Sequence, residues 1–404
     1  MPPKRIGPYQ IEATLGRGGI GTVYRAHDRR TGEPVALKLL TTGPALHPTA
    51  ALRLAREFET LASLSHPNVV RVFDTGVHEG YPYLAMELID GLDLKAWLSV
   101  DLSSSLGGET FRELLTSSQE EIGRMSIEGF GEPWSEELSR PKGSIPKPPE
   151  PGSAEALAPF DVDRWASEPL TDEGFAASLS HGRGRGVAAL RALAQLADEP
   201  DTDDGEAPGE VPVLFPPEGP PSEIAAEPPP PDLGALNRPE RISRLKDAAQ
   251  QLCQALAFIH ARGLVHRDVK PANVLVTEDR RVKLMDFGLA KFLAAESAVT
   301  DVRRIVGTYR YMAPEQALAE QLDGRADLYS LGVMLYELLA GRPPYEARTA
   351  QELWQKVLET EPPPLGSLNP GVDYTLAVVV HRLLRKAPED RFQTAEEIYD
   401  ALME

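Results

Sequence analysis

The sequence is almost devoid of cysteine and contains no long apolar run. Its 404 residues include one cysteine, Cys253, so the chain cannot form an internal disulfide, which is consistent with a reducing compartment. No stretch approaches the 18 apolar residues that favour a membrane-spanning helix, and the start MPPKR is not followed by the apolar segment of a secretory signal. We therefore expect a cytoplasmic protein without a membrane span, in which Cys253 packs in a helical core.

Basic residues are also few relative to acidic ones, and nearly all of the acidic excess lies in one segment. The chain has 42 Lys+Arg against 61 Asp+Glu, a net charge of −19. Residues 101–237 alone carry 27 acidic and 9 basic residues, a net −18, together with 19 of the 37 prolines. Such an acidic segment argues against nucleic acid or an anionic membrane as its partner.

A segment of this composition cannot bury enough apolar surface to form a core, so 101–237 is predicted to be a largely disordered insertion. Two short stretches, 111–124 and 187–197, could be helical. The run Pro228–Pro231 could bind a polyproline-recognising partner protein, or the insertion could be a plain spacer. Lengthening a loop from about 8 to about 137 residues costs on the order of 2.5 kcal/mol, which a sizeable core tolerates. We expect the insertion to be dispensable for intrinsic activity.

The most informative motifs are HRDVKPAN at 266–273 and DFG at 286–288. The carboxylate of Asp268 can accept a hydroxyl proton, and Lys270 can neutralise a phosphoryl group in transfer. The amide oxygen of Asn273 and the carboxylate of Asp286 can hold magnesium. Together they supply the positioning and charge neutralisation that phosphoryl transfer requires. A lone Asp or Asn is more often a turn or a cap, but that reading does not explain the whole constellation.

A glycine-rich run near the start places Gly16, Gly18 and Gly21 in a G-x-G-x-x-G pattern. Dinucleotide-binding folds share this pattern but continue into a helix, with an acidic residue about 20 positions later. Here the β-branched and aromatic residues 22–24 predict a second strand instead. The glycines then form a hairpin tip whose backbone amides can approach phosphates.

Lys38 belongs to an apolar strand, because Val35, Leu37 and Leu39 surround it in the sequence. A lysine enclosed in this way needs an anionic partner. Helical spacing over 53–64 offers Glu57 and Glu59 on the following segment.

These motifs, in this order, resemble those of eukaryotic-type (Hanks-type) serine/threonine protein kinases of bacterial style. The resemblance covers 9–100 and 238–402 and includes GTYRYMAPEQ at 307–316. It implies a two-lobed α+β kinase fold, with a small antiparallel-sheet N-lobe at 1–91 and a mainly helical C-lobe at 92–100 and 238–404. The implied reaction transfers the γ-phosphate of ATP to Ser/Thr hydroxyls of proteins, including the kinase itself, with Mg²⁺ or alternatively Mn²⁺.

The resemblance also assigns site residues. Glu57, nine residues before His66 of an HPN motif, becomes the partner of Lys38. The nucleotide site combines the glycine hairpin, the adenine pocket, the gatekeeper Met86, the hinge from Glu87 to Ile89 and a ribose-binding acid. Its residues are Leu15, Gly16, Gly18, Gly21, Val23, Ala36, Lys38, Met86, Glu87, Ile89, Asp93, Leu275 and Asp286. Asp327 is expected to hold the backbone of the catalytic loop, and Glu315 to pair with Arg391.

Residues 289–315 resemble an activation segment. Its expected autophosphorylation site is Thr300, with Ser297 as second choice, and Arg267 would pair with the added phosphate. Lys270 together with Thr308 favours Ser/Thr over Tyr acceptors in this family, and His266 is expected to pack rather than to act as an acid or base.

Two alternative functions stay open at this point. A pseudokinase scaffold would usually lack at least one phosphate-handling group, whereas all of them are present. A small-molecule phosphotransferase would not need the APE element at 313–315.

Overall fold

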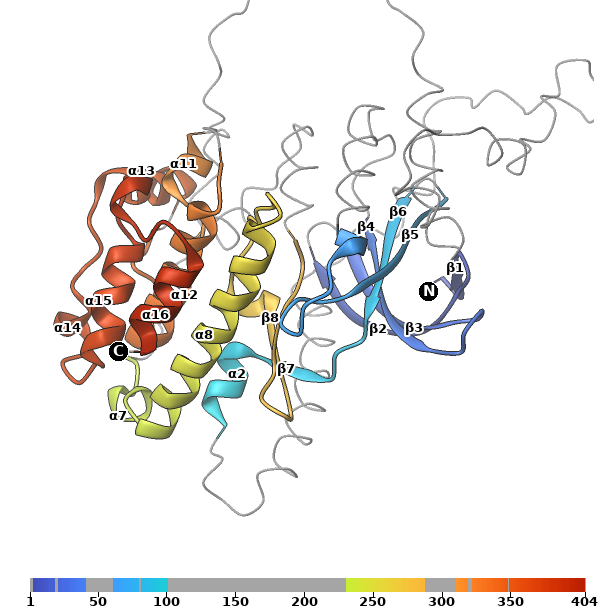
Figure 1. Ribbon diagram of the computed structural model, residues 1–404, viewed down its shortest axis with the longest axis horizontal. Helices are drawn as coiled ribbons and strands as arrows, with labels where there is room; N and C mark the ends of the chain where they lie inside the picture. Colours follow the sequence, from blue (N-terminus) through green and yellow to red (C-terminus); the bar gives the residue numbers. More distant parts are fainter. Residues whose placement is uncertain are drawn as a thin grey trace, which may run out of the picture.

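The structure is a computed structural model that describes residues 3–18, 21–40, 61–79, 81–100, 230–287, 310–318, 322–347 and 349–403. Figure 1 shows two groups of elements, a lobe of β-strands and a lobe of α-helices, joined through a second small sheet. This arrangement confirms the predicted two-lobed α+β fold. Within the described ranges, no helix is long and apolar enough to cross a membrane.

The N-lobe is built on a six-stranded antiparallel sheet with the order β1-β2-β3-β4-β6-β5. The strands are β1 (Arg5–Ile6), β2 (Tyr9–Gly18), β3 (Gly21–Asp28), β4 (Pro34–Leu40), β5 (Val72–His78) and β6 (Tyr81–Glu87). Side chains alternate between the faces of a strand. In β4, Val35, Leu37 and Leu39 therefore pack in a separate hydrophobic core that contains only N-lobe residues. Ala36 and Leu40 belong to the larger core that extends into the C-lobe. Lys38 shares the face of Ala36 and Leu40.

The glycine-rich run joins two paired strands, as predicted, rather than a strand and a helix. Gly18 lies opposite Gly21 at the end of the β2–β3 pairing, and two register shifts bend β2 before this point. A Cβ atom at Gly21 would lie 2.1 Å from the carbonyl oxygen of Leu39, so that the tight approach of β3 to β4 requires glycine there.

A three-stranded sheet with the order β7-β8-β9 connects the lobes. Its strands are β7 (Gly91–Asp93), β8 (Val274–Thr277) and β9 (Val282–Leu284). The helix α2 (Leu94–Ser99) follows β7 directly, and Asp93 caps it by accepting hydrogen bonds from the backbone N–H groups of Lys95 and Ala96. The register pairs Asp93 with Leu275, so residues on either side of the long insertion are neighbours in space.

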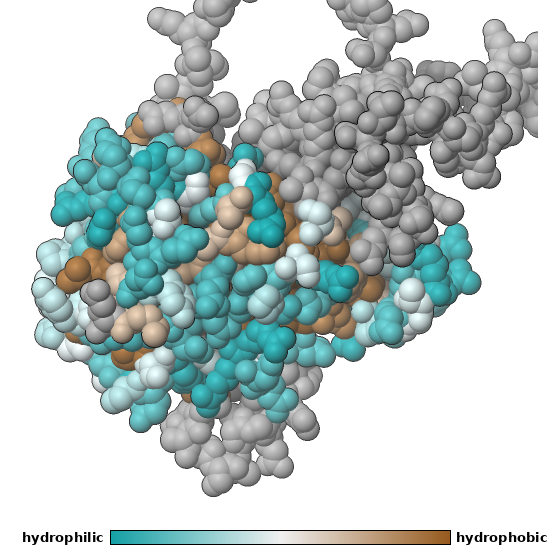
Figure 2. All heavy atoms as spheres, in the orientation of Figure 1, coloured by the Kyte–Doolittle hydropathy of each residue, from teal (hydrophilic) through white to brown (hydrophobic). Residues whose placement is uncertain are grey.

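The C-lobe is mainly helical. Its helices are α7 (Leu233–Leu236), α8 (Pro239–His260), α11 (Pro314–Ala317), α12 (Arg325–Ala340), α13 (Ala350–Glu359), α14 (Leu365–Leu368), α15 (Tyr374–Leu383) and α16 (Ala395–Met403). α12 is apolar on nearly all sides and almost wholly buried, while α8 packs against α16 and α12 against α15. Cys253 of α8 is buried, which raises the pKa of its thiol and fits the predicted packing role. Figure 2 shows a mostly hydrophilic outer surface on this lobe, with hydrophobic residues visible toward the N-lobe.

Two arginines of α8 hold the chain on both sides of the insertion. The guanidinium of Arg244 donates hydrogen bonds to the carbonyl oxygens of Trp97 (3.0 Å), Leu98 (3.3 Å) and Val100 (2.9 Å), where α2 ends. Arg241, one turn earlier, donates to the carbonyl oxygens of Leu236 (3.0 Å) and Leu338 (2.8 Å). The ends of the insertion are therefore attached to the same face of one helix.

Residues 230–237, which the sequence predicts to be part of the insertion, pack against the C-lobe. Asn237 and the fully buried Asn369 exchange two side-chain hydrogen bonds, of 2.6 Å and 2.9 Å, and Asn369 also donates to the carbonyl oxygen of Leu339. Pro231 lies so close to Gly341 that a Cβ atom on this glycine would come within 2.5 Å of the proline ring. Pro231 and Asn237 thus attach this segment to the helical part of the C-lobe.

We predict different outcomes for two shortened chains that carry the same Gly/Ser linker. Removal of 101–229 should leave the free energy of unfolding unchanged or slightly higher, because loop-closure entropy is recovered. Removal of 101–237 should lower it by about 1–3 kcal/mol, because the buried amide of Asn369 loses its partner. Denaturant titration of both proteins measures the difference, and equal stabilities would contradict the structural role of 230–237.

Candidate active site

Two predicted catalytic residues converge on one carboxylate oxygen of a third. Oδ2 of Asp268 accepts hydrogen bonds from Nζ of Lys270 and from Nδ2 of Asn273, each at 2.7 Å. Nδ2 of Asn273 also donates to the backbone oxygen of Asp268 at 2.8 Å. A 3-10 turn over Pro271–Asn273 makes this convergence possible, because it folds the loop back after Lys270. The carboxylate of Asp268 is therefore fixed in orientation by a cation and an amide.

The β8–β9 pairing brings Asp286 beside Asn273, although the two are thirteen positions apart in the sequence. Val274 lies opposite Leu284, and the backbone N–H of Met285 donates to the carbonyl oxygen of Asn273 at 2.8 Å. Asp286 is the next residue and adopts a positive φ of 55°, a conformation that aspartate tolerates better than most residues. Backbone hydrogen bonds thus set the separation of the two predicted metal ligands.

The donor set of Asn273 and Asp286 fits a magnesium ion. Because Nδ2 of Asn273 is committed to two oxygens of Asp268, its Oδ1 is left as the acceptor of that buried amide. Asp286 adds a carboxylate. Mg²⁺ prefers such oxygen ligands and completes its coordination with water and phosphate oxygens.

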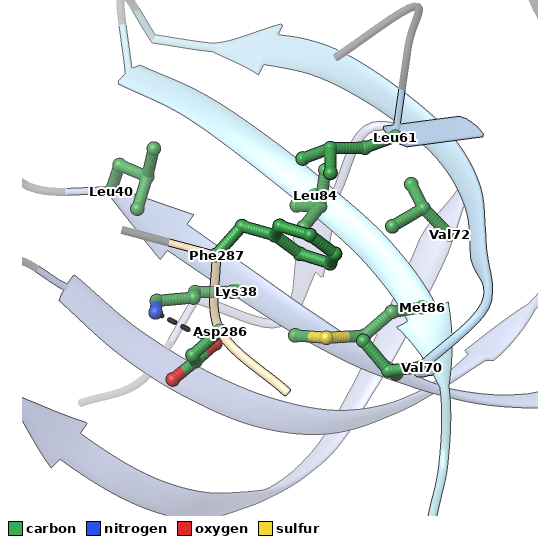
Figure 3. A pocket seen from close by; sticks show the side chains of 9 residues that line it. All are labelled: Lys38, Leu40, Leu61, Val70, Val72, Leu84, Met86, Asp286 and Phe287. Atoms are coloured by element: carbon green, nitrogen blue, oxygen red, sulfur yellow. Dashed lines mark ion pairs between the residues drawn. The ribbon is translucent and has the colours of Figure 1, made fainter. Parts of the chain in front are cut away.

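Lys38 and Asp286 form an ion pair between the lobes. Nζ of Lys38 lies 2.9 Å from Oδ1 of Asp286, and the two side chains are 12% and 28% exposed. Figure 3 shows both side chains at the edge of a small cavity. The predicted partner of Lys38, Glu57, lies outside the described residues. The lysine predicted to bind phosphate and the aspartate predicted to bind metal therefore face the same space.

Asp327 holds the backbone of the catalytic loop. Its fully buried carboxylate accepts hydrogen bonds from the backbone N–H groups of His266 and Arg267, both at 2.7 Å, and contacts Nε2 of His260 at 2.8 Å. Arg267 adopts a φ of 68°, which is unfavourable for a residue with a Cβ atom. The role of Asp327 was expected from sequence, whereas His260, at the end of α8, carries no motif that could have identified it.

His266 is a structural residue in this geometry. It is completely buried, and burial lowers the pKa of its imidazole. Its Nε2 contacts the carbonyl oxygen of Met285 at 2.9 Å, so Nε2 carries the proton and Nδ1 accepts the backbone N–H of Asp268 at 3.3 Å. The neutral ring packs against Phe287 with centroids 4.9 Å apart. His266 thereby ties the two motifs together.

The residues predicted to bind the adenosine moiety lie around the junction of the lobes. Ala36 pairs with Met86 across β4 and β6, and Gly16 pairs with Val23 across the glycine hairpin. Leu15, Val23 and Ile89 are half-buried and pack against the main core. Behind Met86 lies the small cavity of Figure 3, lined by Lys38, Leu40, Leu61, Val70, Val72, Leu84, Met86, Asp286 and Phe287.

Glu87, at the start of the predicted hinge, connects the lobes through its side chain. Oε2 of Glu87 lies 2.9 Å from Nζ of Lys283 in β9 and accepts the backbone N–H of Arg71 at 3.3 Å. Lys283 carries no signal in the sequence, because an isolated strand lysine has no spacing that reveals a partner 196 residues away.

Glu315 and Arg391 form the expected ion pair. The two terminal nitrogens of Arg391 donate to the two carboxylate oxygens of Glu315, at 2.7 Å and 2.8 Å. The same guanidinium donates to the carbonyl oxygens of Arg325, Arg385 and Lys386, so all its donors are used although it is buried. The pair fixes α11 and hence the end of the predicted activation segment. Thr300, Ser297 and Thr308 lie outside the described residues.

Comparison with known proteins gives consistent findings. The family model "protein tyrosine and serine/threonine kinase" matches residues 9–401. The serine/threonine-protein kinase PknB of Mycobacterium leprae is 27% identical over 401 residues, which cover 98% of this chain and 43% of the relative. A probable serine/threonine-protein kinase of Streptomyces coelicolor is 28% identical, with 98% and 40% covered. The chain thus spans about two-fifths of the length of these relatives.

Solved structures show the same fold. A crystal structure of the PknI kinase domain of Mycobacterium tuberculosis has a TM-score of 0.51 and 22% identity, and the match covers 98% of this chain and 95% of that chain.

We predict that Asp327→Ala destabilises the protein strongly, by about 3 kcal/mol or more, because buried N–H groups of the catalytic loop lose their acceptors. Asp327→Asn keeps one acceptor oxygen and should lose less stability. The matched control is Asp279→Asn, since Asp279 is exposed and pairs only within its own turn. Urea denaturation measures all three variants. If Asp327→Ala unfolds like the control, the carboxylate does not hold the loop.

Proposed function

Because the chain belongs to the protein tyrosine and serine/threonine kinase family, we propose that it transfers the γ-phosphate of ATP to serine or threonine hydroxyls of proteins. The observation that carries this proposal is the carboxylate of Asp268, oriented by Lys270 and Asn273. The names of the curated relatives specify serine/threonine kinases. Lys270, two residues after Asp268, agrees with this choice of acceptor.

Each residue of the site has a role in this reaction. Asp268 accepts the proton of the attacking hydroxyl group, and Lys270 offsets negative charge on the phosphoryl group as it moves. Asn273 and Asp286 would hold Mg²⁺, which neutralises charge on the phosphate oxygens when bound. Lys38 and the backbone amides of the glycine hairpin orient the phosphates of ATP. Such arrangements act mainly through positioning and electrostatic stabilisation.

We predict that Asp268→Asn and Asp286→Asn each reduce the turnover number by at least about 10²–10³-fold, because both act on charge that develops in the transition state. The assay uses the purified chain, labelled ATP, Mg²⁺ and a generic basic protein. Both side chains are partly solvent-exposed, so cooperative unfolding should persist. Asp279→Asn again serves as the control and should turn over like the parent. Near-normal turnover in Asp286→Asn would refute the metal assignment.

Phosphorylation of the chain by itself at Thr300 belongs to the same proposal. Thr300 lies eight residues before Thr308, the spacing of the phosphothreonine in the kinases that the sequence resembles, and Arg267 would pair with the phosphate. We predict that mass spectrometry of protein incubated with ATP finds phosphate at Thr300, and that Thr300→Ala lowers activity. An unmodified Thr300 in fully active enzyme would exclude this site, and phosphate at Ser297 would replace it.

The insertion is proposed to select partner proteins rather than to support catalysis. Its charge and proline content support this role, as does the attachment of its two ends to α8. The chain without 101–229 should phosphorylate a generic peptide normally and lose particular cellular partners. Unchanged partners would favour the spacer alternative.

A further inference from the structure

A short helix beside the predicted nucleotide site is held at both ends by side chains. At the start of α2, Oδ1 of Asp93 accepts the backbone N–H groups of Lys95 and Ala96, each at 2.9 Å. At its end, the guanidinium of Arg244 donates to three backbone carbonyl oxygens and lies 5.1 Å from the centroid of the Trp97 ring. The kinase motifs assign no role to Arg244, which belongs to α8.

α2 depends on these contacts because it has only six residues. Helices of this length are unstable in isolation, and the carbonyl groups of the last turn lack partners within the helix. Arg244 supplies hydrogen-bond donors and a positive charge at that end, where the helix dipole favours a cation. The buried side chains of Leu94, Trp97 and Leu98 hold one side of the helix against the core. Loss of Arg244 should therefore loosen α2, including the N–H groups that hold Asp93.

Asp93 is the residue that the resemblance to kinases places at the ribose of ATP. Its backbone pairs with Leu275, a residue of the predicted adenine pocket, and α2 packs against both β8 and the Pro271–Asn273 turn. Both capping hydrogen bonds use Oδ1 of Asp93, so Oδ2 is the oxygen that can accept a ribose hydroxyl. The cap therefore fixes the rotation of the carboxylate that would bind the nucleotide.

We propose that Arg244 is a positioning residue for the ribose of ATP, and that it acts through α2 on the carboxylate of Asp93. The inference rests on the proposed protein-kinase function and adds a residue that sets how the nucleotide is held. Arg244 also donates to the carbonyl oxygen of Val100, the residue directly before the insertion. The first end of the insertion and the nucleotide site thus share one anchor.

The test compares ATP with 2′,3′-dideoxy-ATP, which lacks only the two ribose hydroxyls. The KM of each nucleotide is measured with Mg²⁺ and a threonine peptide, and the ratio of the dideoxy value to the ATP value is called the ribose ratio. For the unmodified chain this ratio should be about 3–10, the contribution of one hydrogen bond. Arg244→Ala should lower it to about 1–2 by raising the KM of ATP. The kcat with ATP should stay within about 2-fold, because Asp268 is oriented by Lys270 and Asn273.

The matched control is Arg241→Ala. Arg241 lies one turn earlier in α8 and also donates to carbonyl oxygens, but to those of Leu236 and Leu338 rather than to α2. Its replacement should lower stability and leave the ribose ratio as in the parent. Arg244→Lys keeps the charge and should give an intermediate ratio, so it carries the test if Arg244→Ala does not fold.

A third variant places Asp93 and Arg244 on one path. Asp93→Ser keeps an oxygen that can cap α2 but removes the carboxylate. Its ribose ratio should be about 1, and adding Arg244→Ala should not change that ratio further. A further fall of the KM ratio in the double variant would mean that Arg244 acts on the ribose by another route, which contradicts the proposal.

The remaining outcomes separate this proposal from the proposed function. A ribose ratio that Arg244→Ala leaves unchanged overturns the positioning role, even if the KM of both nucleotides rises together. An equal fall in Arg241→Ala also overturns it, because general loosening of the lobe would then explain the effect. If the unmodified chain phosphorylates no serine or threonine peptide, the proposed function fails. The ribose ratio is then measured from dissociation constants by titration calorimetry and judges the role of Arg244 separately.

Discussion

The active site depends on one buried carboxylate that touches none of the reacting groups. Asp327 is fully buried, and burying a charge is unfavourable unless hydrogen-bond donors surround it. Two of its donors are backbone N–H groups of the catalytic loop, and the third is His260. These contacts hold Arg267 at a positive φ, and that turn directs Asp268 toward Lys270 and Asn273. Through these contacts α12, buried in the C-lobe core, fixes the position of the predicted catalytic carboxylate.

Backbone pairing likewise positions Asn273 and Asp286, the two proposed metal ligands. The β8–β9 register and the Met285–Asn273 hydrogen bond determine where Asp286 stands relative to Asn273. His266 also connects the two motifs, because its ring hydrogen-bonds to the carbonyl oxygen of Met285 and to the backbone N–H of Asp268. Replacement of the Asp286 side chain, a proposed metal ligand, would therefore leave in place the backbone contacts that position the loop. Catalysis and folding use largely separate groups.

Sequence reasoning found the residues whose spacing is tied to chemistry, and it failed where only the fold creates a neighbour. The motifs at 266–273 and 286–288 identified the residues around Asp268, and alternation identified the strand of Lys38. Three contacts had no pattern to reveal them: Glu87 with Lys283, Asn237 with Asn369, and Glu337 with Lys95. The two residues of each pair are 196, 132 and 242 positions apart in the sequence, respectively. The same limit explains why composition alone places 230–237 in the insertion, since the segment continues the proline-rich run while its contacts are with α12, Gly341 and Asn369.

The way the insertion is attached explains how the fold accommodates it. Arg244 donates to the carbonyl oxygen of Val100, and Arg241 donates to that of Leu236. Burial and the neighbouring charge of Arg244 lower the pKa of Arg241 to about 10. Arg241 therefore stays charged at neutral pH, and both guanidiniums meet carbonyl oxygens at helix C-termini, where a positive charge is favourable. These contacts close the loop with residues of the lobe itself. The attachment uses backbone carbonyl oxygens rather than the acidic side chains of 101–237, so it does not depend on the net charge of −18 that this segment carries.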